Sequence, residues 1–287
     1  MTDQAQNLRE FVRKNHPSGR VLAVTSGKGG VGKSTTSVNL AIALAAQRKR
    51  AIILDADLGL ANVEVLMGLN SLYNLQHVIE GEKSMMEILV KGPGGVEIVP
   101  GSSGLVKMAD LGPSARQNLL SGLRALQEHA DFIVVDTMAG IGRNAVSFAV
   151  AADEIILVTT PEPSAIVDAY AMVKAIHAQR DSAVFRLVVN MVSSRQQAAA
   201  VTANLTRIAQ QYLGCNVNAL GYILRDPHVS QAVMQTQPFL LKFPASTASR
   251  CIEEIASHVI HRPIAANRPT AGFLRRFAQT FGLADTG

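Results

Sequence analysis

Short hydrophobic runs alternate with longer amphipathic stretches along most of this chain. The runs predict β-strands at Val21–Val24, Ala51–Leu54, Val96–Val99, Phe132–Val135, Ile155–Thr159, Phe185–Val189 and Leu220–Ile223. Between them the hydrophobic residues have helical spacing, as in Ser34–Gln47. Strands that alternate with helices favour a mostly parallel sheet with helices on both faces. The expected fold class is therefore α/β, with a twisted, three-layer arrangement.

Two end segments fall outside this alternation. Residues 1–19 form a polar leader in which a short helix is predicted at Asp3–Lys14, and residues 20–261 carry the alternating pattern. Residues 262–287 contain a proline-marked linker and a final short helix at Ala271–Leu283. We therefore expect one large domain with an appendage at each end.

A glycine-rich loop follows the first predicted strand. Residues 26–35 read Ser-Gly-Lys-Gly-Gly-Val-Gly-Lys-Ser-Thr, the pattern of a phosphate-binding loop between a strand and a helix. Glycines let backbone N–H groups curl around a polyphosphate, and the helix N-terminus favours its negative charge. Lys33 is expected to reach the β- and γ-phosphates, and the Ser34 hydroxyl to bind Mg²⁺. The nucleotide-binding residues predicted here are Gly27, Gly29, Gly30, Val31, Gly32, Lys33, Ser34 and Thr35.

Carboxylates follow two other predicted strands. Asp136 ends the run Phe132–Val135, a pattern typical of the strand that positions Mg²⁺ in such nucleotidases. Asp55 and Asp57 follow Leu54, and two acids near a triphosphate require Mg²⁺ or water between them. We expect Asp55 near the metal and Asp57 orienting the attacking water. Alternatively, Asp57 caps a helix that starts near Ala61.

Polar residues at the ends of later strands are candidates for the nucleotide base. Asn190 can both donate and accept hydrogen bonds, as the adenine edge requires, and Asp226 follows the next predicted strand. Both residue types are also common in turns. Residues 136–142 are punctuated by glycines and are expected to respond to the γ-phosphate.

Composition narrows the class of protein. The 287 residues are 48% hydrophobic and 17% charged, enough for a large core. The N-terminal residues lack the hydrophobic region of a signal peptide, and no run approaches the ~20 hydrophobic residues of a membrane span. The two cysteines, Cys215 and Cys251, follow no motif and are expected to be buried thiols. The net charge of +5 is compatible with anionic lipid, nucleic acid or nucleotide.

Lys28, the extra lysine of the loop, carries a family resemblance. Together with Asp55-Ala56-Asp57 and Asp136, it makes residues 20–261 resemble the MinD/ParA family of deviant Walker-A ATPases. The resemblance implies ATP, ADP and Mg²⁺ as ligands, and hydrolysis of ATP. It also implies a homodimer formed on ATP, in which Lys28 reaches the partner's nucleotide and acts with Lys33 and Asp57 in catalysis.

The leader narrows the resemblance. Asp3, Gln4, Ala5, Leu8 and Arg9 match the leader of the FlhG (YlxH/FleN) flagellar-number regulators, in which it stimulates the signal-recognition-type GTPase FlhF. The resemblance implies FlhF as a partner, with flagellar switch proteins or a flagellar transcription activator in some branches. Two departures are Leu224-Arg225, where relatives often have a proline, and Arg143, where an acidic residue is frequent.

The final helix has a hydrophobic face. That face contains Phe273, Leu274, Phe277 and Phe281, and Arg275 and Arg276 lie beside it. Similar helices in the family bind anionic membranes, which implies a cytoplasmic protein that is peripheral on the inner face of the cell membrane in its ATP state. Alternatively, the helix packs on the core, and each arrangement can belong to a different nucleotide state.

Four functions other than a flagellar switch are compatible with a phosphate-binding loop of this kind. A MinD-like regulator of cell-division placement is the first alternative, and the leader argues against it. A ParA-type partitioning protein would need a basic cluster for DNA, whereas basic residues here are scattered, so direct nucleic-acid binding is not expected. A relative of the nitrogenase iron protein would need cysteines at a dimer interface. A scaffold that does not hydrolyse its nucleotide also stays open.

Overall fold

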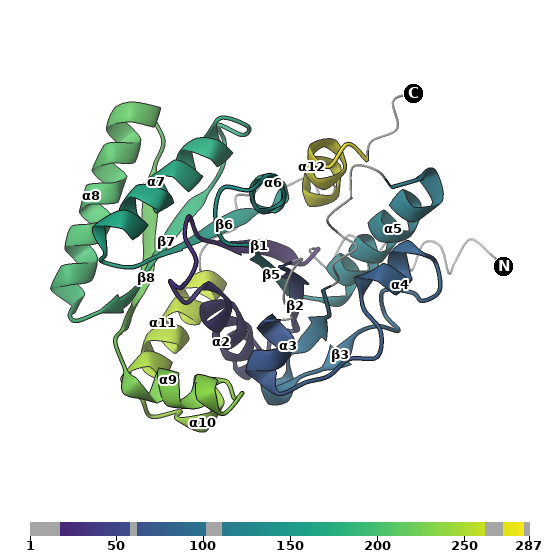
Figure 1. Ribbon diagram of the computed structural model, residues 1–287, viewed down its shortest axis with the longest axis horizontal. Coiled ribbons are helices and arrows are strands. Elements are labelled where there is room, and N and C mark those ends of the chain that lie inside the picture. Colours follow the sequence, from purple (N-terminus) through teal and green to yellow (C-terminus); the bar gives the residue numbers. More distant parts are fainter. Residues whose placement is uncertain (1–17, 58–61, 102–110, 262–271, 284–287) are drawn as a thin grey trace.

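The computed structural model describes residues 18–57, 62–101, 111–261 and 272–283. The leader residues Asp3, Gln4, Ala5, Leu8 and Arg9, the whole of the predicted linker, and residues 58–61 after Asp57 lie outside these ranges. The predicted three-layer α/β fold is confirmed: one twisted sheet lies between two layers of helices (Figure 1).

The sheet has eight strands in the order β3-β4-β2-β5-β1-β6-β7-β8, and all neighbours are parallel except β3 and β4. The strands are β1 (Arg20–Thr25), β2 (Ala51–Ala56), β3 (Val90–Lys91), β4 (Glu97–Val99), β5 (Phe132–Thr137), β6 (Glu154–Thr159), β7 (Phe185–Val192) and β8 (Val217–Leu224). All seven predicted strands are present. The two-residue edge strand β3 was not predicted, because it is too short to show a period.

The helices fall on both faces of the sheet. They are α2 (Lys33–Ala46), α3 (Asn62–Met67), α4 (Leu75–Ile79), α5 (Pro113–His129), α6 (Arg143–Ala151), α7 (Pro163–His177), α8 (Arg195–Leu213), α9 (Pro227–Met234), α10 (Phe239–Lys242), α11 (Thr247–His261) and α12 (Gly272–Thr280), with a 3₁₀ turn at Pro93–Gly95. In β1, Val21 and Ala23 face the core beneath α4–α8 and α12, whereas Leu22 and Val24 face the core beneath α2, α10 and α11. This alternation within a fully buried strand produces the two layers.

The polar residues at the strand ends belong to the strands themselves. Asp55 and Asp136 are paired opposite each other in β2 and β5, and Asn190 lies within β7. The hydrophobic runs ended before these residues, so the predicted strands were two or three residues too short. The structure continues them because parallel neighbours satisfy their backbone hydrogen bonds.

Helix α12 lies against the body of the domain, beside α6 and α5 (Figure 1). Its aromatic face belongs to the core there. Phe273, Phe277 and Phe281 are at most 5% exposed, and the rings of Phe277 and Phe281 lie 5.6 and 5.0 Å from that of Phe148 on α6. Arg276 donates to the carbonyls of Ala151 and Ala152 at the end of α6 and pairs with Asp153. Leu274 is partly buried on the same core. The alternative in which this helix packs on the core therefore describes this state of the molecule.

Candidate functional site

The glycine-rich loop joins β1 to α2 at the carboxyl edge of the sheet. Gly30 and Gly32 have φ values of 80° and 83°, which residues with side chains rarely adopt. A Cβ atom on Gly27 would lie 2.0 Å from the carbonyl oxygen of Asp168, and one on Gly32 would lie 2.3 Å from Asn190 Nδ2. The loop is therefore packed tightly between α7 and β7.

Lys33 is held at the centre of the site. Its Nζ donates to Asp136 Oδ1 at 2.9 Å and to Ser34 Oγ at 3.1 Å, and the side chains of Lys33 and Asp136 are 6% and 0% exposed. Ser37 donates to the same Asp136 oxygen at 2.6 Å. Lys33 thus contacts both of the predicted residues Ser34 and Asp136, and its contact with Asp136 spans 103 residues of sequence.

Asp55 and Asp136 form a buried acidic pair beside Lys33. Burial, and then the charge of Asp136, raise the pKa of Asp55 from 3.8 to about 7. One carboxylate oxygen of each, Asp55 Oδ2 and Asp136 Oδ2, has no hydrogen-bond partner among the described residues. Because a buried, unpaired carboxylate oxygen is costly, this arrangement fits a divalent cation.

The donor set suits Mg²⁺ bound together with phosphate. The described residues contain no group of three or more His, Cys, Asp or Glu side chains able to hold a metal alone. Mg²⁺ usually keeps several waters and takes one or two carboxylates plus substrate phosphates. Ser34, Asp55 and Asp136 are therefore suitable ligands for Mg²⁺. Their binding of the metal stays a prediction.

Asp57 lies at the opening of the site. Its N–H donates to Asp55 Oδ1 at 3.0 Å, and its own carboxylate accepts from Asn62 Nδ2 at 3.1 Å. Asn62 is the first residue of α3, so the carboxylate contacts a side-chain amide at the start of the helix. Asp57 is partly exposed, which leaves it open to water.

Lys28 points away from the phosphate loop and toward α7. Its Nζ lies 3.0 Å from Glu162 Oε2 and 3.0 Å from Ser164 Oγ, and the Lys28 and Glu162 side chains are 38% and 65% exposed. The extra lysine is therefore separate from Lys33 and reaches the surface. An exposed pair of this kind contributes little stability, about 0–1 kcal/mol, so another partner can replace it.

The predicted base-binding residues have contacts within the chain. Asn190 Nδ2 donates to Val31 O at 2.8 Å, and Asn190 Oδ1 accepts from the N–H of Met191. Asp226 caps α9 through the N–H of His228 and accepts from the Thr247 hydroxyl and the Ala248 N–H of α11. Burial opposes ionisation of Asp226, but these hydrogen bonds outweigh it and lower its pKa. Adenine contacts by either residue stay a prediction.

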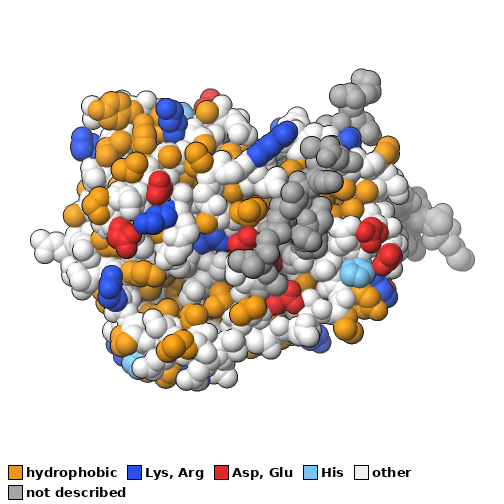
Figure 2. All heavy atoms as spheres, in the orientation of Figure 1, with side chains coloured by type: hydrophobic (Ala, Val, Ile, Leu, Met, Phe, Trp, Pro, Cys, Tyr) orange, Lys and Arg blue, Asp and Glu red, His pale blue; other side chains and the backbone are white. Residues whose placement is uncertain are grey.

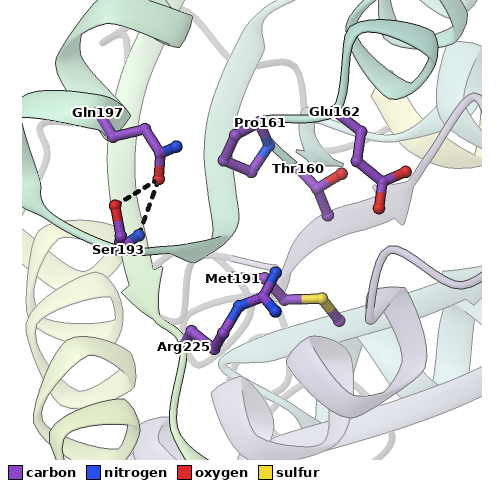
Figure 3. A pocket seen from close by; sticks show the side chains of 7 residues that line it. All are labelled: Thr160, Pro161, Glu162, Met191, Ser193, Gln197 and Arg225. Atoms are coloured by element: carbon purple, nitrogen blue, oxygen red, sulfur yellow. Dashed lines mark hydrogen bonds between the residues drawn. The ribbon is translucent and has the colours of Figure 1, made fainter.

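A pocket of about 180 Å³ opens beside the phosphate loop (Figure 3). It is lined by Thr160, Pro161, Glu162, Met191, Ser193, Gln197 and Arg225. In Figure 3, Arg225 extends into the pocket from the end of β8, and Gln197 and Ser193 lie on one side of it, across from Thr160 and Glu162. Gln197 Oε1 accepts from the N–H and hydroxyl of Ser193 at 2.8 and 3.0 Å, which leaves its amide N–H groups as donors.

Sequence reasoning missed several residues of the site. The only sequence feature that relates Ser37 to the site is its position four residues after Lys33, one helical turn away. Glu162 and Ser164 follow the predicted strand Ile155–Thr159, but no pattern there predicted a contact with Lys28. Arg225, at which the sequence departs from relatives, lies in the lining of the pocket.

The cysteines do not form a joint site. Cys215 and Cys251 are both buried and free, and burial raises the pKa of each thiol. Cys215 belongs to the core beneath α4–α8 and α12, whereas Cys251 belongs to the core on the other face of the sheet. Two thiols on opposite faces do not support a metal–sulfur cluster.

Comparison with known proteins identifies the family. The ParA model, described as NUBPL iron-transfer P-loop NTPase, matches residues 18–260. Antiactivator FleN of Pseudomonas aeruginosa is 42% identical over 252 residues, which cover 88% of this chain and 90% of FleN. Flagellum site-determining protein YlxH of Helicobacter pylori is 31% identical over 271 residues, covering 91% and 92% of the two chains.

Among solved structures, the cell division ATPase MinD of Pyrococcus furiosus has the same fold. It superposes with a TM-score of 0.70 at 24% identity, over 84% of this chain and 98% of MinD. The phosphate loop, the extra lysine and the two acidic strand ends are therefore found on the fold in which the sequence predicted them. The chain belongs to the ParA family of P-loop NTPases, and it is an ATPase of the MinD/ParA type.

Proposed function

We propose that this ATPase is a switch that regulates the number or placement of flagella and that changes between monomer and dimer with its nucleotide. The similarity to FleN and YlxH over about nine-tenths of the chain carries the flagellar part of this proposal. The sequence match of the leader to the FlhG group supports it independently.

ATP binding would rearrange the buried charges of the site. Lys33 pairs with Asp136 in this structure and would contact the β- and γ-phosphates when nucleotide is bound. Ser34, Asp55 and Asp136 would hold Mg²⁺, which neutralises charge that develops on the phosphates. Asp57, open to water and fixed by Asn62, would orient the attacking water molecule.

The pocket beside the phosphate loop is proposed as the base site. Arg225 can lie over a purine ring, because a guanidinium stacks on aromatic faces, and the Gln197 amide can donate to ring nitrogens. Asn190 donates one amide hydrogen to Val31 O of the phosphate loop, and its second amide hydrogen would be a donor to the base. Arg225 would then replace the contact that a proline makes in relatives.

The face around Lys28 is proposed as the dimer interface. Two exposed hydrophobic residues, Ile141 and Val167, are 57% and 66% exposed. Each adjoins a residue that contacts the loop: Gly140 donates to Ser26 O, and the Asp168 carbonyl packs on Gly27. A second copy on this face would bury both side chains, and Lys28 would exchange Glu162 for the partner's nucleotide.

Membrane attachment is proposed for the dimer, through α12. Its aromatic face is buried on α6 in this structure, so the helix must leave the domain before it can bind lipid. None of the described helices is long and apolar enough to cross a membrane. A dimer would present two such helices, and paired weak anchors bind anionic lipid far more strongly than one.

The proposed partners are the signal-recognition-type GTPase FlhF, through the leader, and flagellar proteins. The description of FleN as an antiactivator supports a transcription activator among them. One experiment tests the flagellar role and its dependence on the nucleotide site. Cells that lack the gene should carry an altered number of flagella, and the wild-type gene should restore it where Lys33→Ala does not.

Normal flagella together with misplaced septa in the deletion strain would overturn the flagellar proposal in favour of a division regulator. A pull-down with and without residues 1–19 tests the GTPase directly. If FlhF is retained by the protein without its leader, the leader is not the binding segment.

A further inference from the structure

The surface over α4 combines exposed hydrophobic side chains with carboxylates. Leu72, Tyr73 and Met86 are 87%, 40% and 40% exposed, and Glu80, Glu82 and Glu87 are exposed around them. We call these six residues the α4 surface. Figure 2 shows carboxylates, a histidine and hydrophobic side chains gathered on this side of the molecule.

Contacts within the α4 surface hold it in one shape. The Lys83 ammonium lies 4.7 Å from the centre of the Tyr73 ring and 3.5 Å from Glu87 Oε1. Ser84 donates its N–H and its hydroxyl to Glu87 Oε2, and these hydrogen bonds lower the pKa of Glu87. The segment from residue 80 to residue 87 thus has three carboxylates and one lysine, a net negative charge beside exposed hydrophobic groups.

Helix α5 connects this surface to the start of the described chain. Gly19 donates its N–H to Gln127 O at 2.8 Å, so the described part of the chain begins beside the end of α5. Further back along α5, Asn118 donates to Ile79 O and Gly122 packs on Met85. The nine residue steps from Asn118 to Gln127 span about 14 Å of helix.

The leader complements the α4 surface in charge and pattern. Ala5, Leu8, Phe11 and Val12 recur at helical spacing, and residues 9–14 contain three basic residues and one acidic residue. A helix of 12 residues is marginal alone and needs a surface to pack on. A leader helix of this length followed by three extended residues reaches about 28 Å. This is twice the 14 Å of α5 that separates Gln127 from Asn118, beside the α4 surface.

We propose that the α4 surface binds the leader of its own chain, residues 1–17. Leu8, Phe11 and Val12 cover Leu72, Tyr73 and Met86, while Arg9, Arg13 and Lys14 face Glu80, Glu82 and Glu87. The leader is thereby kept against the domain. This inference does not depend on flagellar regulation, but if the leader also binds a GTPase, the two contacts exclude each other.

Hydrogen exchange of residues 72–87 tests the proposal in the full-length protein. Arg9→Glu combined with Arg13→Glu should make these amides exchange several-fold faster at low salt, because the leader is released. Glu80→Lys combined with Glu82→Lys should have the same effect. The variant that combines all four substitutions should exchange slowly again, because its charges are once more opposite. If the α4 substitutions only disturbed the local structure, slow exchange would not return.

Glu253→Lys combined with Glu254→Lys provides the matched control, because these exposed carboxylates lie on α11 on the other face of the sheet. This pair should leave exchange of residues 72–87 unchanged, and should not rescue the leader variant. Equal exchange in the wild-type protein and the leader variant would overturn the proposal. So would protection that grows with protein concentration, which would assign the surface to a second copy.

Discussion

Asp55 and Asp136 lie opposite each other on the neighbouring parallel strands β2 and β5, and the two carboxylates are in different electrostatic environments. Asp136 is paired with Lys33, whereas Asp55 accepts the N–H of Asp57 and has a pKa raised to about 7. A buried acid with this pKa carries a proton over part of the physiological pH range. The state of Asp55 therefore sets the charge of the site before nucleotide binds.

The pKa of Asp55 predicts how stability depends on pH in the absence of Mg²⁺ and nucleotide. Between about pH 4 and pH 7 the folded protein holds a proton that the unfolded chain has released, so the free energy of unfolding falls as pH rises, by at most about 1.4 kcal/mol per pH unit. Asp55→Asn should flatten this slope in urea unfolding, whereas Asp57→Asn should keep it. An unchanged slope in Asp55→Asn would contradict the assignment.

Asp57→Ala should slow ATP hydrolysis about 10²- to 10⁴-fold, because the proposed water-orienting carboxylate is removed, and should prolong the ATP-bound dimer. Asn62→Ala, which removes the contact that fixes Asp57, should have a smaller effect in the same direction. Phosphate release under single-turnover conditions measures both. A wild-type rate in Asp57→Ala would remove this residue from catalysis.

Lys28→Ala should bind ATP but should not dimerise on it, because the lysine that crosses to the partner's nucleotide is missing. Lys174→Ala is the matched control, since it removes another exposed lysine, on α7. Light scattering with and without ATP measures the molar mass of each variant and thereby distinguishes monomer from dimer. Detection of an ATP-induced dimer of Lys28→Ala would exclude action in trans.

Phe148→Ala should increase binding of the nucleotide-free protein to anionic vesicles. The substitution removes the ring on which Phe277 and Phe281 pack, at a cost in stability of about 3–5 kcal/mol, while α12 itself stays unchanged. Truncation after Arg268 should abolish vesicle binding in either background. If sedimentation with vesicles is the same for the truncated and full-length chains, the helix serves the core alone.

Arg225→Ala should raise the KM for ATP about tenfold and leave kcat close to its wild-type value, because the base contact is the same in ground and transition states. Tyr212→Ala, an exposed aromatic substitution on α8, should change neither. A fall in kcat without a change in KM would place Arg225 outside the base pocket.

The sequence was sufficient to predict seven of the eight strands that the structure describes and the residues that meet around Lys33, because both follow from local patterns. The strands around Asp55 and Asp136 are continuous hydrophobic runs, and the phosphate loop is a contiguous motif. Long-range contacts were not predictable in the same way. Lys28 contacts Ser164, which lies 136 residues away in the sequence. The carboxylate of Asp226 accepts hydrogen bonds from both α9 and α11. The packing of α12 depended on the shape of α6, which no pattern in the C-terminal residues encodes.

The tight contact between Gly27 and the carbonyl of Asp168 has a practical consequence. With no room for even a methyl group between them, the loop cannot shift toward α7 without displacing the helix. Val167, exposed and next to Asp168, therefore offers a site for an environment-sensitive dye. Because Val167 also lies on the proposed dimer face, a label there would convert the pairing of two copies into an optical signal, without altering a residue of the phosphate loop.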